Sequence, residues 1–73
     1  MSHLPILSGK ELIRILKRLG YQEVRQRGSH IRLVCPRRKP LTVPNYKTID
    51  RTLLRKILRD AELSPEQFAA FMN

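Results

Sequence analysis

The spacing of apolar residues changes along this chain, and the change limits the folds it can form. Between residues 8 and 19 the apolar positions recur every three or four residues, as on one face of a helix. These positions are Leu12, Ile13, Ile15, Leu16 and Leu19. Between residues 21 and 43 they recur at every second place, as in strands with one buried face. Helical spacing returns after residue 50.

Residues that begin or end helices and strands lie where the spacing changes. Ser8 and Glu11 have capping-box spacing, and Gly20 is suited to the end of a helix. Gly28 and Ser29 are typical of a turn. We therefore predict a helix over residues 8–19 and strands over 21–27 and 30–35.

The second half of the chain is divided in the same way. Prolines at both ends bracket a loop over residues 36–40, and Pro44 stops a strand over 41–43. A second helix is predicted over 50–61, with Thr48 and Asp50 as alternative caps. Ser64 and Pro65 begin a short last helix that would bury apolar side chains. These are Phe68, Phe71 and Met72.

These elements indicate an α+β fold of order α-β-β-β-α. Three short runs with short connections favour a three-stranded antiparallel sheet, and the simplest two-layer solution packs both main helices on one face. A short extra helix follows at the C-terminus. A chain of 73 residues has room for one small core, so we expect a single domain over residues 1–73.

Positive charge is concentrated in the middle of the chain. Fifteen Lys and Arg residues outnumber six Asp and Glu residues, for a formal charge of +9, and every cation lies between Lys10 and Arg59. Such an excess is typical of a protein that binds a polyanion or an acidic partner protein. The alternative is a solvated basic surface.

Several classes of protein are disfavoured. The lone Cys35 cannot form an internal disulfide, which favours a reducing, cytoplasmic setting. No apolar run is long enough to span a membrane. The acids are scattered, and His3, His30 and Cys35 lack zinc-site spacing, so we expect no metal and no small-molecule cofactor.

The period of two assigns side chains to the two faces of the sheet. Ile31, Leu33 and Cys35 should face the helices, so His30, Arg32 and Val34 should face away. On the first strand Val24 should point inward, and Glu23, Arg25 and Arg27 outward.

The exposed face would then carry Arg25, Arg27, His30 and Arg32. The guanidinium of arginine matches phosphate geometry, and histidine can transfer protons near neutral pH. Phosphate binding and proton transfer are what cleavage of an RNA backbone requires. On spacing alone, His30 could equally be a surface residue that stabilises the turn, and His3 has no evident role.

The chain resembles the HicA, or YcfA-like, family of toxins from toxin–antitoxin systems, over about residues 6 to 68. The matching segments are Ser8-Gly9-Lys10-Glu11-Leu12, Leu19-Gly20-Tyr21, Val24-Arg25-Gln26-Arg27-Gly28-Ser29-His30, Thr42-Val43-Pro44 and Leu54-Arg55-Lys56-Ile57-Leu58.

This resemblance implies a fold like that of double-stranded-RNA-binding domains. It implies a metal-independent endoribonuclease that cuts mRNA and arrests translation, and an acidic HicB-like antitoxin that covers the active surface. The family's essential histidine corresponds to His30. We assign general acid or base catalysis to His30 and RNA contacts to Arg25, Arg27, Gly28, Ser29, Arg32 and Lys47.

The chain departs from the family pattern at two places. Tyr46 stands where a histidine is frequent, and Thr52-Leu53 replaces a Gly-Thr pair at the second main helix. A phenol is a poor base at neutral pH, so we expect Tyr46 to pack or to stack on a base.

Two other functions fit the same residues. A non-catalytic RNA-binding module of this fold would use His30 only as a contact. A protein-binding domain would use the basic face for an acidic partner. Only Tyr21 and Tyr46 are candidates for base stacking outside the last helix.

Overall fold

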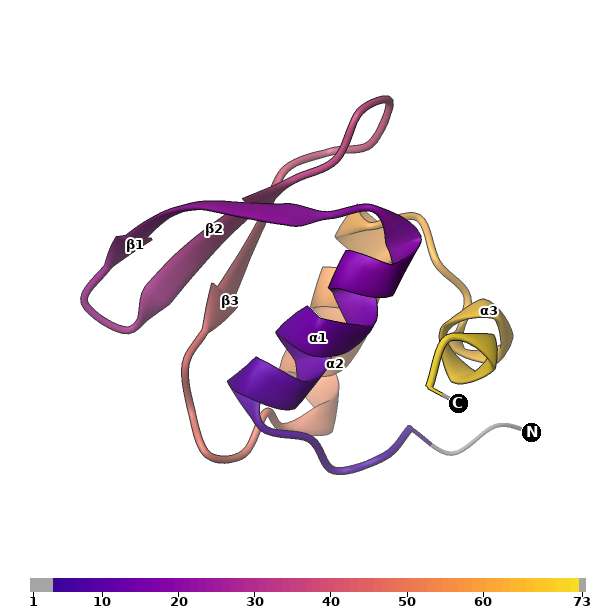
Figure 1. Ribbon diagram of the computed structural model, residues 1–73. Coiled ribbons are helices and arrows are strands. Elements are labelled where there is room, and N and C mark those ends of the chain that lie inside the picture. Colours follow the sequence, from indigo (N-terminus) through magenta and orange to yellow (C-terminus); the bar gives the residue numbers. More distant parts are fainter. Residues whose placement is uncertain (1–3, 73) are drawn as a thin grey trace.

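The computed structural model describes residues 4–72 and has the predicted α+β arrangement (Figure 1). Three strands form one antiparallel sheet in the order β1-β2-β3, and α1 and α2 lie on one side of it (Figure 1). The elements are α1 (Gly9–Leu19), β1 (Gln22–Arg27), β2 (His30–Val34), β3 (Leu41–Pro44), α2 (Arg51–Asp60) and α3 (Pro65–Ala70). His3 lies outside the described residues.

The helix ends follow from local hydrogen bonds. The Ser8 hydroxyl accepts from the Glu11 amide at 3.1 Å, and the Glu11 carboxylate accepts from the Ser8 amide at 2.9 Å. Both bonds hold the pKa of Glu11 below its ordinary value. At α2 the Asp50 carboxylate accepts from the Leu53 amide at 2.8 Å, so Asp50 rather than Thr48 is the cap.

The core lies between the sheet and the helices. Both main helices, β2 and β3 contribute fully buried side chains, and Phe68 of α3 closes one end. Phe71 and Met72, which follow the end of α3, are partly buried against the core, so their predicted burial is met only in part. The largest aliphatic contributors are Leu12, Leu16, Leu33, Ile49, Leu54 and Leu58.

The predicted orientations of two side chains in β1 are wrong. The pairing with β2 is interrupted by a β-bulge between Glu23 and Arg25, so Val24 has no cross-strand partner. Val24 is 56% exposed instead of buried. Glu23 pairs with the buried Leu33 and accepts from the Lys17 ammonium of α1 at 3.1 Å, so it lies on the helix side. An extra residue shifts the inside–outside alternation of a strand by one place.

The β1–β2 hairpin extends beyond the helices (Figure 1). All six residues of β1 are exposed, whereas β2 alternates between buried and more exposed positions and β3 is buried at all its residues except Thr42. β1 is therefore open to a ligand along its length. Within residues 4–72, no helix has the length and apolar character needed to cross a membrane.

Candidate nucleic-acid interface

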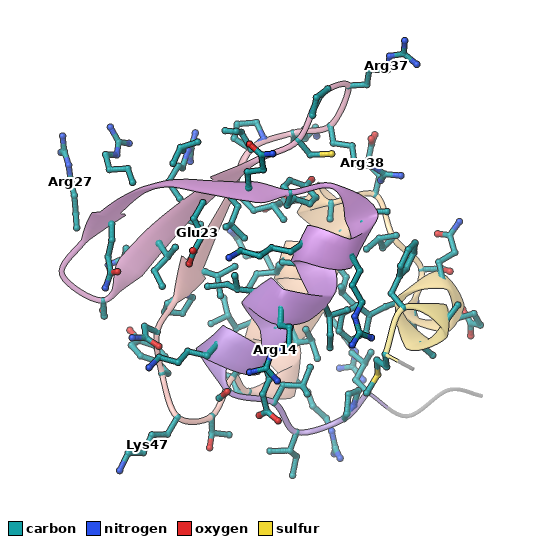
Figure 2. All side chains as sticks on the ribbon, in the orientation of Figure 1. Arg14, Glu23, Arg27, Arg37, Arg38 and Lys47 are labelled. Atoms are coloured by element: carbon teal, nitrogen blue, oxygen red, sulfur yellow. The ribbon has the colours of Figure 1, made fainter. Side chains whose placement is uncertain are left out.

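The strand register brings four predicted site residues together. Arg25 pairs with Arg32, and Arg27 pairs with His30. Directly opposite residues of antiparallel strands share a face, with Cβ atoms about 4.5–5.5 Å apart. Figure 2 shows Arg27 pointing away from the helices. We call this exposed side of the sheet, with Arg25, Arg27, His30 and Arg32, the arginine face.

The arginine face carries uncompensated positive charge. None of the strand residues that share it is acidic, because the bulge turns Glu23 to the other side (Figure 2). Arg25 and Arg32 face one another, and like charges in that position repel. The Arg32 guanidinium also donates to the Thr42 hydroxyl on β3 at 3.2 Å. An anion bound between the guanidiniums would relieve this repulsion.

A tight turn holds His30 at the end of the hairpin. Gly28 has a positive φ of +56°, whereas the φ of Ser29 is not positive. This combination is typical of a two-residue hairpin turn with glycine at its first central position. The Gln26 amide donates to the Gly28 carbonyl oxygen at 3.0 Å and braces the turn. The Ser29 carbonyl oxygen accepts from the backbone amide of Asn45 at 2.6 Å. The turn is thus fixed to the chain that follows β3.

The imidazole of His30 is exposed and makes no hydrogen bond to another described side chain or backbone group. Its nearest cross-strand neighbour is Arg27, and Pro44 lies opposite it on β3. Both ring nitrogens can therefore reach a ligand on the arginine face. An imidazole in this setting can exchange protons with a substrate whose phosphate lies on the guanidiniums.

The structure separates Lys47 from the arginine face. Lys47 follows β3 and points downward in Figure 2, below the sheet, whereas Arg27 points upward from the hairpin. It lines a hollow with Ser8, Lys10, Asn45 and Tyr46.

Sequence reasoning did not identify Thr42 or Asn45, because both contacts depend on how β3 pairs with β2. Period-two patterning assigns the faces of a strand but not its register.

Most of the positive charge lies outside the arginine face. Eight cations are on the two main helices, and Arg37 projects from the loop after β2 with a φ of +69° (Figure 2). Two hydrogen bonds fix that loop. The Arg38 guanidinium donates to the Ala61 carbonyl oxygen at 2.6 Å, and the Tyr21 hydroxyl donates to the Lys39 carbonyl oxygen at 2.9 Å. Among the described residues, no three His, Cys, Asp or Glu side chains cluster as metal ligands.

Comparison with known proteins identifies relatives. The family model for the HicA toxin of bacterial toxin–antitoxin systems matches residues 9–63. A solved structure described as a toxin–antitoxin complex from Streptococcus pneumoniae is similar, with a TM-score of 0.70 and 26% identity. The match covers 78% of this chain and 98% of that one. No curated protein matches this chain. Since the family model spans most of the sequence, the chain belongs to the HicA family of toxins.

Proposed function

We propose that this toxin is a metal-independent endoribonuclease that cuts mRNA in the cytoplasm and so arrests translation. One observation carries the proposal: His30 is exposed directly opposite Arg27, on a strand face with three arginines and no acid. This pairs a group that can move a proton with groups that hold phosphate. Membership of the HicA toxin family supports the same reading.

The proposed reaction is attack of a ribose 2′-oxygen on the adjacent phosphorus. The 2′-O–P bond forms and the bond from phosphorus to the 5′-oxygen breaks, leaving a 2′,3′-cyclic phosphate and a 5′-hydroxyl. His30 either takes the 2′-hydroxyl proton or gives a proton to the leaving 5′-oxygen. Water carries the other proton. Arg25, Arg27 and Arg32 stabilise the charge that develops on the phosphate oxygens, and Gly28 and Ser29 offer backbone contacts beside them.

The proposed protein partner is an acidic, HicB-like antitoxin. The similar solved chain comes from a toxin–antitoxin complex, and a basic face with no acidic residue on its strands fits an acidic surface. A partner that covered His30 would also exclude RNA. Opposite potentials would speed association, and the rate would fall as salt rises.

The test of catalysis is the variant His30→Ala in purified form. Removal of a general acid or base lowers rates by about 10²–10⁴-fold, so cleavage of RNA and growth arrest should both be lost. Arg55→Ala, which removes an exposed cation on α2, is the matched control and should cleave normally. Excess EDTA should leave cleavage intact.

If the His30→Ala protein cleaves as fast as its parent, the catalytic assignment is wrong. If the parent binds RNA tightly but never cleaves it, the chain is a non-catalytic RNA-binding module. Strict dependence on added Mg²⁺ would overturn the metal-independent mechanism. For the partner, an acidic antitoxin should abolish cleavage at equal stoichiometry and protect amides near His30 from hydrogen exchange. Protection confined to α1 and α2 would contradict masking.

A further inference from the structure

Tyr46 is the one Tyr or Phe side chain that is exposed to solvent within residues 4–72. It is 47% exposed, whereas Tyr21 and Phe68 are buried at 1% and 0%, and Phe71 is partly buried against the core. The sequence left packing and base stacking as alternatives for Tyr46. Its exposure argues against packing. The burial of Tyr21 excludes that residue as a stacking candidate, because a base cannot stack on a buried ring.

The surroundings of Tyr46 suit a nucleotide. A hollow of about 280 Å³ is lined by Ser8, Lys10, Asn45, Tyr46 and Lys47. Both lysines are exposed, and no acid lines the hollow. Pockets that enclose whole small molecules measure roughly 300–1,000 Å³, so this one suits a ligand that rests on one side of it. An aromatic ring that lines a hollow together with two lysines offers stacking to a base and positive charge to its phosphates.

The backbone beneath Tyr46 is fixed in advance. Its carbonyl oxygen accepts from the Gly9 amide at 2.8 Å, at the start of α1. The amide of the preceding Asn45 donates to Ser29 at 2.6 Å. There is no room for a side chain at Gly9, where a Cβ would overlap the Pro44 carbonyl oxygen. A rigid platform loses little conformational entropy when a base stacks on it.

The hollow is also close to the proposed catalytic residue. His30 pairs with Pro44, two residues before Tyr46. Paired Cα atoms lie about 4.5–5.5 Å apart and two residues span at most about 7 Å, so the two Cα atoms are separated by no more than about 13 Å. One RNA strand can therefore contact both places by passing round the end of β3.

We propose that Tyr46, with Lys10 and Lys47, forms a base-stacking subsite for single-stranded RNA. The proposal rests on the proposed ribonuclease function, whose substrate it concerns. A base next to or near the scissile phosphate stacks on the Tyr46 ring, and the lysines contact the phosphates on either side. This subsite helps to select the position of cleavage through stacking strength. It also gives Lys47 a role away from the arginine face.

Intrinsic fluorescence provides a direct test, because the chain has two tyrosines and no tryptophan. Tyr21 is buried, so quenching by an added oligoribonucleotide reports on Tyr46. The titration uses His30→Ala protein, which keeps the RNA intact. We expect quenching by short RNA of ordinary bases and none by an abasic strand of equal length. Quenching by the abasic strand, or by neither strand, would overturn the subsite.

Substitutions separate stacking from charge. Tyr46→Leu should weaken binding of the ordinary strand by roughly 5- to 100-fold, while Tyr46→Phe binds normally. Neither should alter binding of the abasic strand. Lys47→Ala should weaken binding of both the ordinary and the abasic RNA, and the control Arg55→Ala should weaken binding of neither. In otherwise unaltered protein, Tyr46→Leu should also shift the preferred cleavage positions.

The outcomes distinguish failure of the base-stacking subsite from failure of the proposed ribonuclease function. Quenching without any cleavage by the parent supports the subsite and contradicts the nuclease. Cleavage that is unchanged in rate and position in Tyr46→Leu, with no quenching, supports the nuclease and overturns the subsite. If Tyr46→Leu binds RNA normally but loses affinity for the antitoxin, the hollow belongs to the protein partner and the proposal is wrong.

Discussion

The contact between the start of α1 and the chain after β3 gives a sharp prediction for Gly9→Ala. A Cβ at this position would overlap the Pro44 carbonyl oxygen and lie 3.0 Å from the Cα of Asn45. These are backbone atoms, so the clash cannot be relieved by rotating a side chain. Gly9 has no positive φ. The expected cost is therefore steric and does not arise from a disfavoured backbone conformation.

Two opposing effects set the magnitude. Alanine favours a helix over glycine by up to about 1 kcal/mol. Overpacking costs about 1–3 kcal/mol, and a weakened hydrogen bond from the Gly9 amide to Tyr46 a further ~0.5–1.5 kcal/mol. The net destabilisation is about 1–3 kcal/mol. A domain of this size loses about 4–8 °C of Tm for each kcal/mol, so the decrease in Tm should lie between several degrees and roughly 20 degrees.

Urea and thermal unfolding followed by circular dichroism measure this loss. Arg14→Ala, an exposed substitution on the same helix, is the control and should change stability by no more than about 0.5 kcal/mol. Gly28 provides a contrast, because a Cβ there meets nothing within 4 Å but φ is +56°. Asparagine tolerates that φ, so Gly28→Asn should cost less than Gly28→Ala. Gly9→Asn should cost at least as much as Gly9→Ala. A Gly9→Ala protein as stable as its parent would refute the steric argument.

Three further predictions concern the strands and their charges. Val24→Ala should change the free energy of unfolding by less than about 0.5 kcal/mol, whereas Leu33→Ala should cost about 2–5 kcal/mol by urea titration. Burial raises the pKa of Tyr21 above its ordinary value of 10.0, so the folded chain holds this proton more tightly. Stability should be intact below about pH 10 and fall above it, and the urea midpoint of Tyr21→Phe should fall less. Each arginine of the arginine face, replaced by alanine, should flatten the salt dependence of RNA binding by roughly 0.7 in log–log slope, and Arg55→Ala should not.

The helix boundaries were predictable because their causes are local. Ser8 with Glu11, and Ser64 with Gln67, form reciprocal hydrogen bonds three residues apart. Such caps can be recognised without knowing what the helix packs against. The inward and outward residues of β2 were predictable for a similar reason, because that strand keeps the period of two throughout.

The faces of β1 were not predictable from its own residues. The bulge at Val24 depends on pairing with β2, and Glu23 is drawn to Lys17 of α1. Both are interactions between distant parts of the chain. The position of Lys47 has the same explanation, since the segment after Pro44 follows no period. Its course is set by hydrogen bonds to Gly9 and Ser29.

The bulge in β1 is hard to explain by folding energetics alone. An unbroken strand would turn Val24 toward the helices, where burial of such a side chain contributes about 1.5–3 kcal/mol. The exposed ion pair between Lys17 and Glu23 stabilises the fold by only about 0.2–1 kcal/mol.

What the bulge achieves is electrostatic. It removes the carboxylate of Glu23 from the arginine face and leaves the guanidiniums without a counterion among the residues of the three strands. The polyanion proposed as ligand would stabilise this arrangement, because it would neutralise positive charges that otherwise repel one another. The arrangement of β1 therefore fits the proposed binding of a polyanion to the arginine face better than it fits the stability of the free protein.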